Sequence, residues 1–372
     1  MMKMINKERL LETFINYVKI SSKSLYEKDI ANRIIADLEE FSYEVYEDNA
    51  GEKLGSNANN LYFFIGGESN EESFIFSSHM DTVIPCDNIE PFIKEGFVTT
   101  DGNTILGADD KAGIAAIVEA LRIIKENNLT HRPIEVIFTI NEEGGLHGSK
   151  NLQYEKLRSK KAIVLDSSGE IGKIIIGAPG QNNLSAKIIG KAAHAGGEPE
   201  NGISSIIVAA EAISNMELLR IDYETTANIG SLTAISPTNI VCPEANLKAE
   251  IRSRDESKLN FYTEKMIDEL KKACNKFGAK LEHSCSAVYN SYKIDENDEF
   301  VIFVEEKCKE MEITSITKEY TGGGSDANIF NENGIKTLNI STGMEKEHTC
   351  SERISIKNLE LLTELVLKLM IV

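Results

Sequence analysis

The sequence lacks the simplest signatures of a nucleic-acid or membrane protein. Asp and Glu (59 residues) outnumber Lys and Arg (40), which leaves a formal net charge of −19. Nucleic-acid binding normally requires a basic face, so we expect no nucleic-acid partner. No apolar run reaches the roughly 18 residues that span a bilayer, so we expect no membrane association either.

Paired cysteines and an apolar N-terminal segment are also missing. The six cysteines are scattered, and none form a Cys-x-x-Cys pair, which argues against a zinc knuckle or a disulfide framework. The N-terminus turns polar within MMKMINKERLLETF and carries no apolar core of signal-peptide length. These features predict a cytoplasmic protein in a reducing compartment.

The composition that is present belongs to a globular chain of two domains. Apolar residues make up 41% and charged residues 27%, which excludes a disordered scaffold. At about 150 residues per domain, 372 residues suggest two. Apolar strands alternate with amphipathic helices, which predicts an α/β fold whose mostly parallel sheet has helices on both faces. The helices are expected near 10–18, 30–38 and 113–125, and the strands at 61–65, 74–77, 134–140, 162–165 and 174–176.

The pattern changes after the turn signal Ala178-Pro179-Gly180. The next stretch follows a β-α-β-β-α-β order, which is typical of a small ferredoxin-like α+β unit. We therefore predict a domain of residues 181–288 inserted into a discontinuous domain of residues 1–180 and 289–372. The expected elements of the insertion are strands at 184–189, 229–235, 247–253 and 280–288 and helices at 204–216 and 256–276.

Polar side chains follow the apolar strands at several points. His79 and Asp81 come after one strand, and in an extended chain residues i and i+2 point the same way. That favours a metal-binding His with a supporting Asp, although a strand-end His and a capping Asp would have the same spacing. Asp109 and Asp110 precede an apolar helix, where they either cap the helix or supply a carboxylate between two cations.

Two further acidic sites repeat this placement. Glu142 and Glu143 follow another strand, where two adjacent carboxylates repel unless a cation or solvent separates them. One could bind a metal while the other stays free as a base. Asp166 ends a third strand, as a ligand or a turn residue. Because the carboxyl ends of parallel strands gather at one sheet edge, these side chains are expected to converge.

A metal cluster of this kind needs a second imidazole. His348 lies in the polar loop EKEHTCSER before the last helix, where a lone His is usually a plain surface residue. His131 and His283 have unremarkable surroundings in the sequence, and His147, after a Gly-Gly pair, stays undecided.

Taken in order, these motifs resemble those of the cocatalytic zinc exopeptidases, a family that includes peptidase T, glutamate carboxypeptidase, aminoacylase and succinyl-diaminopimelate desuccinylase. The similarity covers essentially the whole chain, including the inserted domain. The segments SSHMDTV, ADDKAG and TGGGSD are most similar to the peptidase T branch. The matching residues are His79-Met80-Asp81, Gly107 to Gly113, Glu142-Glu143, Asp166, Gly323 to Asp326 and His348.

The resemblance implies a set of metal ligands. His79 and Asp166 would hold one zinc ion, and Glu143 and His348 would hold the other. Asp109 would bridge the two ions, with a cis peptide bond after it. Two zinc ions per chain are thus implied, although cobalt or manganese also suit a site of mixed nitrogen and oxygen ligands.

The resemblance also implies roles around the metals. Asp81 would orient His79, and Glu142 would act as the general base on a metal-activated water. In the inserted domain, which serves the family as a lid and dimerisation domain, His194, Asn239 and Arg252 match substrate-contacting residues. In dimeric members the His reaches the partner's active site, so a homodimer through the lid domain is an expectation.

The activity implied is hydrolysis of short peptides. In the family, Asp rather than Glu at the position of Asp166 usually marks aminopeptidases and acylases, which favours release of the N-terminal residue of a tripeptide. A carboxypeptidase or an N-acyl-amino-acid amidohydrolase on the same metal site is the alternative. A non-catalytic metal- or peptide-binding protein is a remote alternative, because such a protein has no need of Glu142 beside a ligand glutamate.

Overall fold

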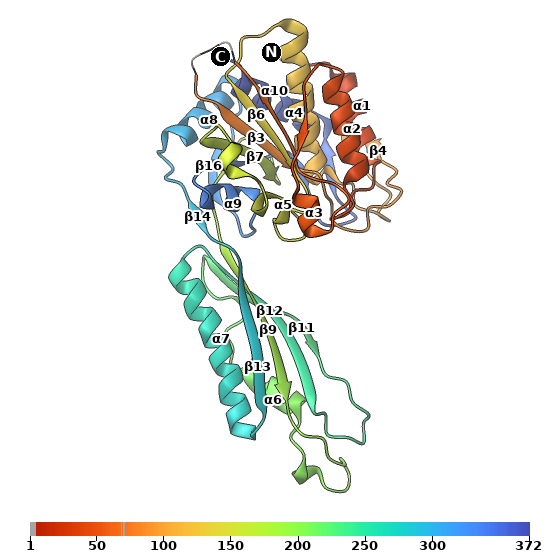
Figure 1. Ribbon diagram of the computed structural model, residues 1–372, viewed down its shortest axis with the longest axis vertical. Coiled ribbons are helices and arrows are strands. Elements are labelled where there is room, and N and C mark those ends of the chain that lie inside the picture. The colour runs from red at the N-terminus through yellow and green to blue at the C-terminus, as the bar shows by residue number, and fades with distance from the viewer. Residues whose placement is uncertain (1–4, 68, 70) are drawn as a thin grey trace. The chain divides into compact units, whose positions relative to one another are not determined.

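The computed structural model describes residues 5–67, 69 and 71–372, which divide into two compact units (Figure 1). The larger unit runs up to Ile176 and resumes over Ile294–Tyr320 and Ser325–Val372. The smaller unit comprises Gly177–Lys293 and Thr321–Gly324. Its bounds lie a few residues outside the predicted insertion of 181–288, because the paired segments at either end, at 177–178 and 292–293, group with it.

The larger unit is built on a mixed sheet in which the central strands are parallel. β6, β3, β7 and β16 run parallel to one another, and β1, β2 and β8 join antiparallel at the edges. This confirms the predicted α/β fold with a mainly parallel sheet. The order is β1 (Tyr46–Glu47), β2 (Leu61–Ile65), β6 (Ile134–Thr139), β3 (Phe74–His79), β7 (Lys161–Ser167), β16 (Lys336–Ser341) and β8 (Lys173–Ala178), with β15 (Thr317–Tyr320) beside β8.

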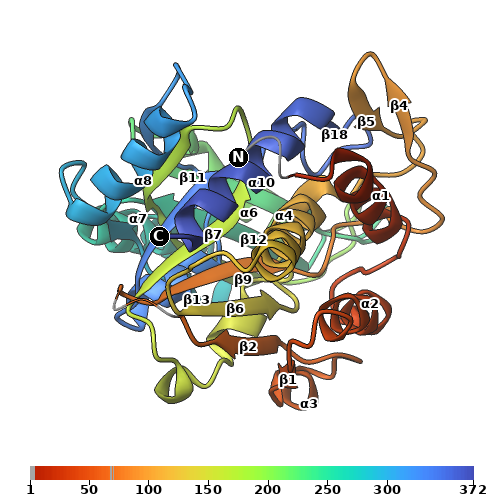
Figure 2. The same ribbon diagram turned by 90° about the horizontal axis from the view of Figure 1, so that it is seen from above.

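Helices cover this sheet and bury its apolar strands. β3 and β6 are buried along their whole length, as expected for strands between two layers. Helices α1, α4 and α10 pack together on one side (Figure 2), and α9 packs against β7 and β16. The helices are α1 (Lys7–Val18), α2 (Lys28–Glu39), α3 (Ala50–Leu54), α4 (Ala108–Asn127), α5 (His147–Lys150), α8 (Glu299–Glu310), α9 (Asp326–Glu332) and α10 (Ile356–Met370), with a 3-10 turn at Tyr154–Lys156.

A second, four-stranded sheet of the larger unit carries the segment that holds His348. Its strands are all antiparallel and run in the order β17 (Met344–Glu345), β18 (Arg353–Ser355), β5 (Phe97–Thr99) and β4 (Phe92–Lys94). His348 lies in the loop between β17 and β18. Among the described helices, none is both long and apolar enough to cross a membrane.

The smaller unit is an antiparallel sheet with two helices. Along β12 buried and exposed residues alternate, so one face of the sheet packs against α6 and α7 and contributes to a core of its own. The order β13-β9-β12-β11, with the helices in β-α-β-β-α-β sequence, is the ferredoxin-like arrangement. The elements are β9 (Gly180–Ile189), a 3-10 turn at Pro199–Asn201, α6 (Ser205–Ser214), β10 (Leu219–Arg220), β11 (Thr225–Thr233), β12 (Glu244–Ser253), α7 (Glu256–Phe277), β13 (Lys280–Tyr289) and β14 (Tyr292–Lys293).

Candidate metal centre

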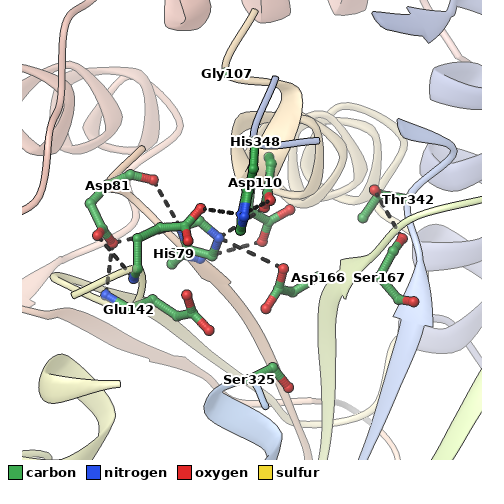
Figure 3. A network of polar contacts seen from close by, with 12 residues as sticks. His79, Asp81, Gly107, Asp110, Glu142, Asp166, Ser167, Ser325, Thr342 and His348 are labelled. Carbon is green, nitrogen blue, oxygen red and sulfur yellow. Dashed lines mark hydrogen bonds and ion pairs between the residues drawn. The ribbon is translucent and has the colours of Figure 1, made fainter. Parts of the chain in front are cut away.

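The structure brings all the predicted metal ligands of the larger unit together. His79 is the last residue of β3, and Asp166 lies near the end of the adjacent strand β7. Glu143 follows the end of β6, and Asp109 lies at the start of α4. Figure 3 shows His79, Glu142, Asp166 and His348 turned toward one another. The parallel order of the strands explains this convergence, because their carboxyl ends share one sheet edge.

The first group of ligands centres on His79. Its Nε2 lies 3.0 Å from Oδ1 of Asp109 and 3.7 Å from Oδ1 of Asp166. One donor atom from each of these three residues fits within a span of 4.8 Å, as ligands of a single ion require.

The second group centres on His348 and shares Asp109 with the first. Nε2 of His348 lies 3.2 Å from Oδ2 of Asp109 and 2.9 Å from Oε1 of Glu143. The two oxygens of Asp109 therefore face different imidazoles. A carboxylate placed in this way can bridge two cations.

The donor set fits divalent metal ions. Imidazole nitrogen and carboxylate oxygen are the ligands that zinc and similar ions take in catalytic sites. Glu143 Oε1 is buried and, despite its closeness to His348, has no hydrogen-bond donor aligned with it among the described residues. A buried carboxylate oxygen is costly unless a cation or a donor satisfies it, so this atom, 2.9 Å from the His348 imidazole, is well suited to share a metal ion with it.

The pKa values of these ligands reflect the crowding of charge. Burial opposes protonation of His79, yet the surrounding carboxylates raise its pKa well above the ordinary value. The close carboxylates of Asp109 and Glu143 raise the pKa of His348 to about 11. Burial raises the pKa of Asp166 to about 7. Bare carboxylates held this closely retain protons on their imidazole neighbours, and a metal ion has to displace those protons.

Glu142 is buried and sits beside the ligands without belonging to either group that shares Asp109. It belongs instead to a third possible grouping with His79 and Glu143. Burial, followed by the charge of Asp166, raises the pKa of Glu142 well above its ordinary value. A raised pKa favours uptake of a proton by this carboxylate, as the role of a general base requires.

Asp81 contacts other groups than the sequence predicts. Nδ1 of His79 is 2.9 Å from the backbone carbonyl of Asp81 and 3.6 Å from its carboxylate. The carboxylate instead accepts the backbone N–H groups of Glu142 and Glu143, at 2.9 and 3.1 Å, and the hydroxyl of Ser24. It therefore orders the turn that carries both glutamates, while its carbonyl fixes the imidazole ring.

The approach to α4 has an unusual backbone. Asp109 and Asp110 are joined by a cis peptide bond, which was expected after Asp109, and both lack helical dihedral angles. The predicted helix of 113–125 therefore begins regularly only after Asp110. Gly107 has φ 75°, and a Cβ there would lie 3.4 Å from a methyl of Thr82, so this turn favours glycine.

The three predicted substrate residues lie in the smaller unit and do not gather at one point. Arg252 is on β12 opposite Gln181 and forms an ion pair with Glu250 at 3.0 Å. His194 and Asn239 neighbour each other past the other end of the β9–β12 ladder, where the N–H of Ala195 donates to the Asn239 carbonyl. Both are exposed, and Nδ1 of His194 accepts two backbone N–H groups.

Two buried glutamates beside the centre were not predicted. Glu352 accepts backbone N–H groups just before and at Asp109, and Glu27 accepts the N–H of Asn141 at 3.0 Å. Glu352 and Glu27 each lie in a polar segment whose pattern is typical of a solvated loop or a helix start. The sequence therefore does not indicate that they are buried. His131, His147 and His283 fall in none of the ligand groups found among the described residues.

Comparison with known proteins places this geometry in a family. The model of peptidase family M20/M25/M40 matches residues 75–371. The Bacillus subtilis (strain 168) protein YqjE is 40% identical over 363 residues, 98% of each chain. The crystal structure of a tripeptidase from Staphylococcus aureus Mu50 is 39% identical with a TM-score of 0.95, and that of aminopeptidase PepT from Bacillus cereus ATCC 10987 is 38% identical with a TM-score of 0.91. Each covers 99% of this chain and 98% of its own.

Proposed function

Because this chain belongs to peptidase family M20/M25/M40 and is thereby a metallo-exopeptidase, we propose that it releases the N-terminal residue of tripeptides and similar short peptides. The observation that carries this proposal is the pair of ligand groups sharing Asp109, beside a glutamate, Glu142, that both groups leave free. The names of the two similar structures, an aminopeptidase and a tripeptidase, support the end that is cut and the peptide length.

The residues present would hold two ions, which we take to be zinc, with cobalt or manganese as substitutes. His79 and Asp166 would bind one ion, Glu143 and His348 the other, and Asp109 both. When bound, such a pair of ions lowers the pKa of a water molecule and polarises the scissile carbonyl.

Glu142 is the proposed general base. Its buried carboxylate accepts the proton of the attacking water and delivers it to the leaving amine, for which its raised pKa is suited. Asp81 supports this step indirectly, because its hydrogen bonds to the N–H groups of Glu142 and Glu143 keep the base and a ligand in fixed relation.

We further propose that the enzyme is a homodimer in which the smaller unit acts as a lid. Arg252 and Glu244 are eight residues apart on β12, or about 26 Å at 3.3 Å per residue, and His194 and Asn239 lie beyond Glu244. An extended tripeptide spans only about 10 Å. One peptide therefore cannot touch Arg252 and His194 of the same chain, so a second copy is needed if both bind it.

The dimer is tested by mixing two inactive variants, His194→Ala and Glu142→Gln, as full-length chains. If His194 acts on the partner's active site, the mixture is expected to recover up to about a quarter of wild-type activity through mixed dimers. No recovery after subunit exchange, verified by mass spectrometry, would rule out a shared site.

The cleavage end is tested with blocked peptides. We expect a free tripeptide to be hydrolysed, an N-acetylated one to be resistant, and a C-amidated one to be cleaved more slowly, because Arg252 would lose its carboxylate partner. Hydrolysis of the N-acetylated peptide would instead support a carboxypeptidase or an acyl-amino-acid amidohydrolase. Metal binding without cleavage of any of these peptides would support a binding protein.

A further inference from the structure

Glu352 lies four residues after His348 and is almost wholly buried, although the segment around it is polar. Its Oε2 accepts the backbone N–H groups of Leu106 and Gly107, at 2.8 and 2.7 Å, and its Oε1 accepts that of Asp109 at 2.9 Å. One carboxylate thus receives three backbone donors from a segment about 245 residues away in the sequence.

These three donors have no partner within their own segment that could replace Glu352. Leu106 and Gly107 lie just before α4, and Asp109 lies in its non-helical first residues, so these N–H groups are outside the regular helix. The residue at the cap position is Gly107, which has no side chain, and no side-chain cap bond forms there. Burial raises the pKa of Glu352 to about 7, and above that pH its ionised carboxylate makes hydrogen bonds about twice as strong as neutral ones. Glu352 therefore fixes the backbone segment that leads into α4 and carries Asp109.

The same residue also anchors the loop that carries His348. The side chain of His348 is 53% exposed, and its backbone has φ 60°. The hydrogen bonds of Thr349 and Ser351 stay inside the loop, to Lys346 and Thr349 itself. His79 and Asp166, by contrast, are held by neighbouring strands of the central sheet. Glu352 therefore connects two ligands of the second group, Asp109 and His348, whereas it reaches the first group only through the shared Asp109.

From this arrangement, and resting on the proposed function, we propose that Glu352 is a positioning residue for the second metal ion, the one held by Asp109, Glu143 and His348. It sets the distance between the Asp109 and His348 segments and touches neither substrate nor metal. Outer partners of metal ligands typically contribute about 10–100-fold to metal affinity.

The test is a titration of metal-free, full-length protein with Zn²⁺ against a chromophoric chelator, repeated with Co²⁺ by visible absorption. In Glu352→Gln, whose amide cannot accept three N–H groups, the dissociation constant of one of the two ions, the one also weakened by His348→Ala, is expected to rise about 10–100-fold. The dissociation constant of the other ion, which His79 and Asp166 also hold, is expected to change less than about threefold. Glu352→Asp keeps the charge but is shorter, and it is expected to affect the same ion by a smaller factor. This variant serves if Glu352→Gln does not fold.

Ser355→Ala is the matched control. Ser355 lies on β18, near Glu352, and its hydroxyl caps α10 by accepting the N–H of Asn358 at 3.0 Å. Loss of this hydroxyl removes the cap of α10 and should lower the stability of the protein. The variant should nevertheless bind both ions as the wild type does. Unchanged binding in Glu352→Gln, or equal weakening of both ions in Glu352→Gln and Ser355→Ala, would overturn the positioning role. Fewer than two ions in wild type would refute the proposed function itself.

Discussion

At the scale of single residues, substitutions of the adjacent glutamates Glu142 and Glu143 are expected to have different effects on metal content. Glu142→Gln is expected to keep two metal ions and lose turnover by about 10²–10⁴-fold, because it removes the base but no ligand. Glu143→Gln is expected to lose an ion as well, because it removes one of the charged ligands that face His348. Metal analysis and steady-state kinetics on both variants provide the measurement. A fully active Glu142→Gln enzyme would contradict the mechanism.

The pKa of His348 determines how metal binding at this site is expected to depend on pH. Its pKa is raised to about 11 by Asp109 and Glu143, so metal-free protein carries a proton there at neutral pH. A metal ion must displace that proton. As the pH rises toward this pKa, metal affinity at this site should therefore increase about tenfold per pH unit, and binding should release a proton.

Zn²⁺ addition in weakly buffered solution at pH 7, followed with a pH indicator, measures this release. His348→Ala is expected to bind less zinc and to release fewer protons. Equal zinc content and equal proton release in that variant would remove His348 from the ligand set.

At the scale of elements, the contact of α4 with the central sheet positions Asp109. A Cβ on Gly113 would lie 2.2 Å from Oγ of Ser78 and 2.9 Å from Cβ of Leu165, on β3 and β7. Gly113→Ala is therefore expected to lower the free energy of unfolding by about 1–3 kcal/mol through overpacking. Urea unfolding measures it. Gly66→Ala, where a Cβ meets nothing within 4 Å, is the control and should change little.

The features of these elements that depend on neighbouring residues in the sequence could be predicted. Those that depend on contacts between distant segments could not. The buried strands β3 and β6 are rich in apolar residues, and acidic or His residues stand at or just after their ends, so the convergence at one sheet edge was predictable. The hydrogen bonds that Glu352 and Glu27 accept were not, because both carboxylates bind backbone distant in sequence. Nor does any local pattern reveal that the carboxylate of Asp81 serves the glutamate turn.

At the scale of the whole molecule, the ligands all belong to the larger unit, while the smaller unit has an apolar core of its own. Calorimetry is expected to resolve a transition that chelation with EDTA shifts and another that it leaves in place. Metal at 100 times its dissociation constant adds about 2.7 kcal/mol to the unit that binds it. An equal shift of both transitions would contradict this assignment.

The family was predictable from the sequence because its motifs are short, local and in a fixed order, and the match over residues 75–371 confirms that resemblance. The separation of Arg252 from His194 was not predictable, because it follows from the register of β9 with β12. The sequence motifs placed all three substrate candidates in one domain. They did not indicate that its sheet separates Arg252 from His194 and Asn239.

The most direct measurement of the central claim is mass spectrometry of the products formed when zinc-loaded protein meets an unblocked tripeptide of three different residues. The account predicts release of the first residue with an intact dipeptide left behind, and loss of that product in Glu142→Gln. Release of the last residue, or an uncleaved tripeptide with two ions bound, would contradict it.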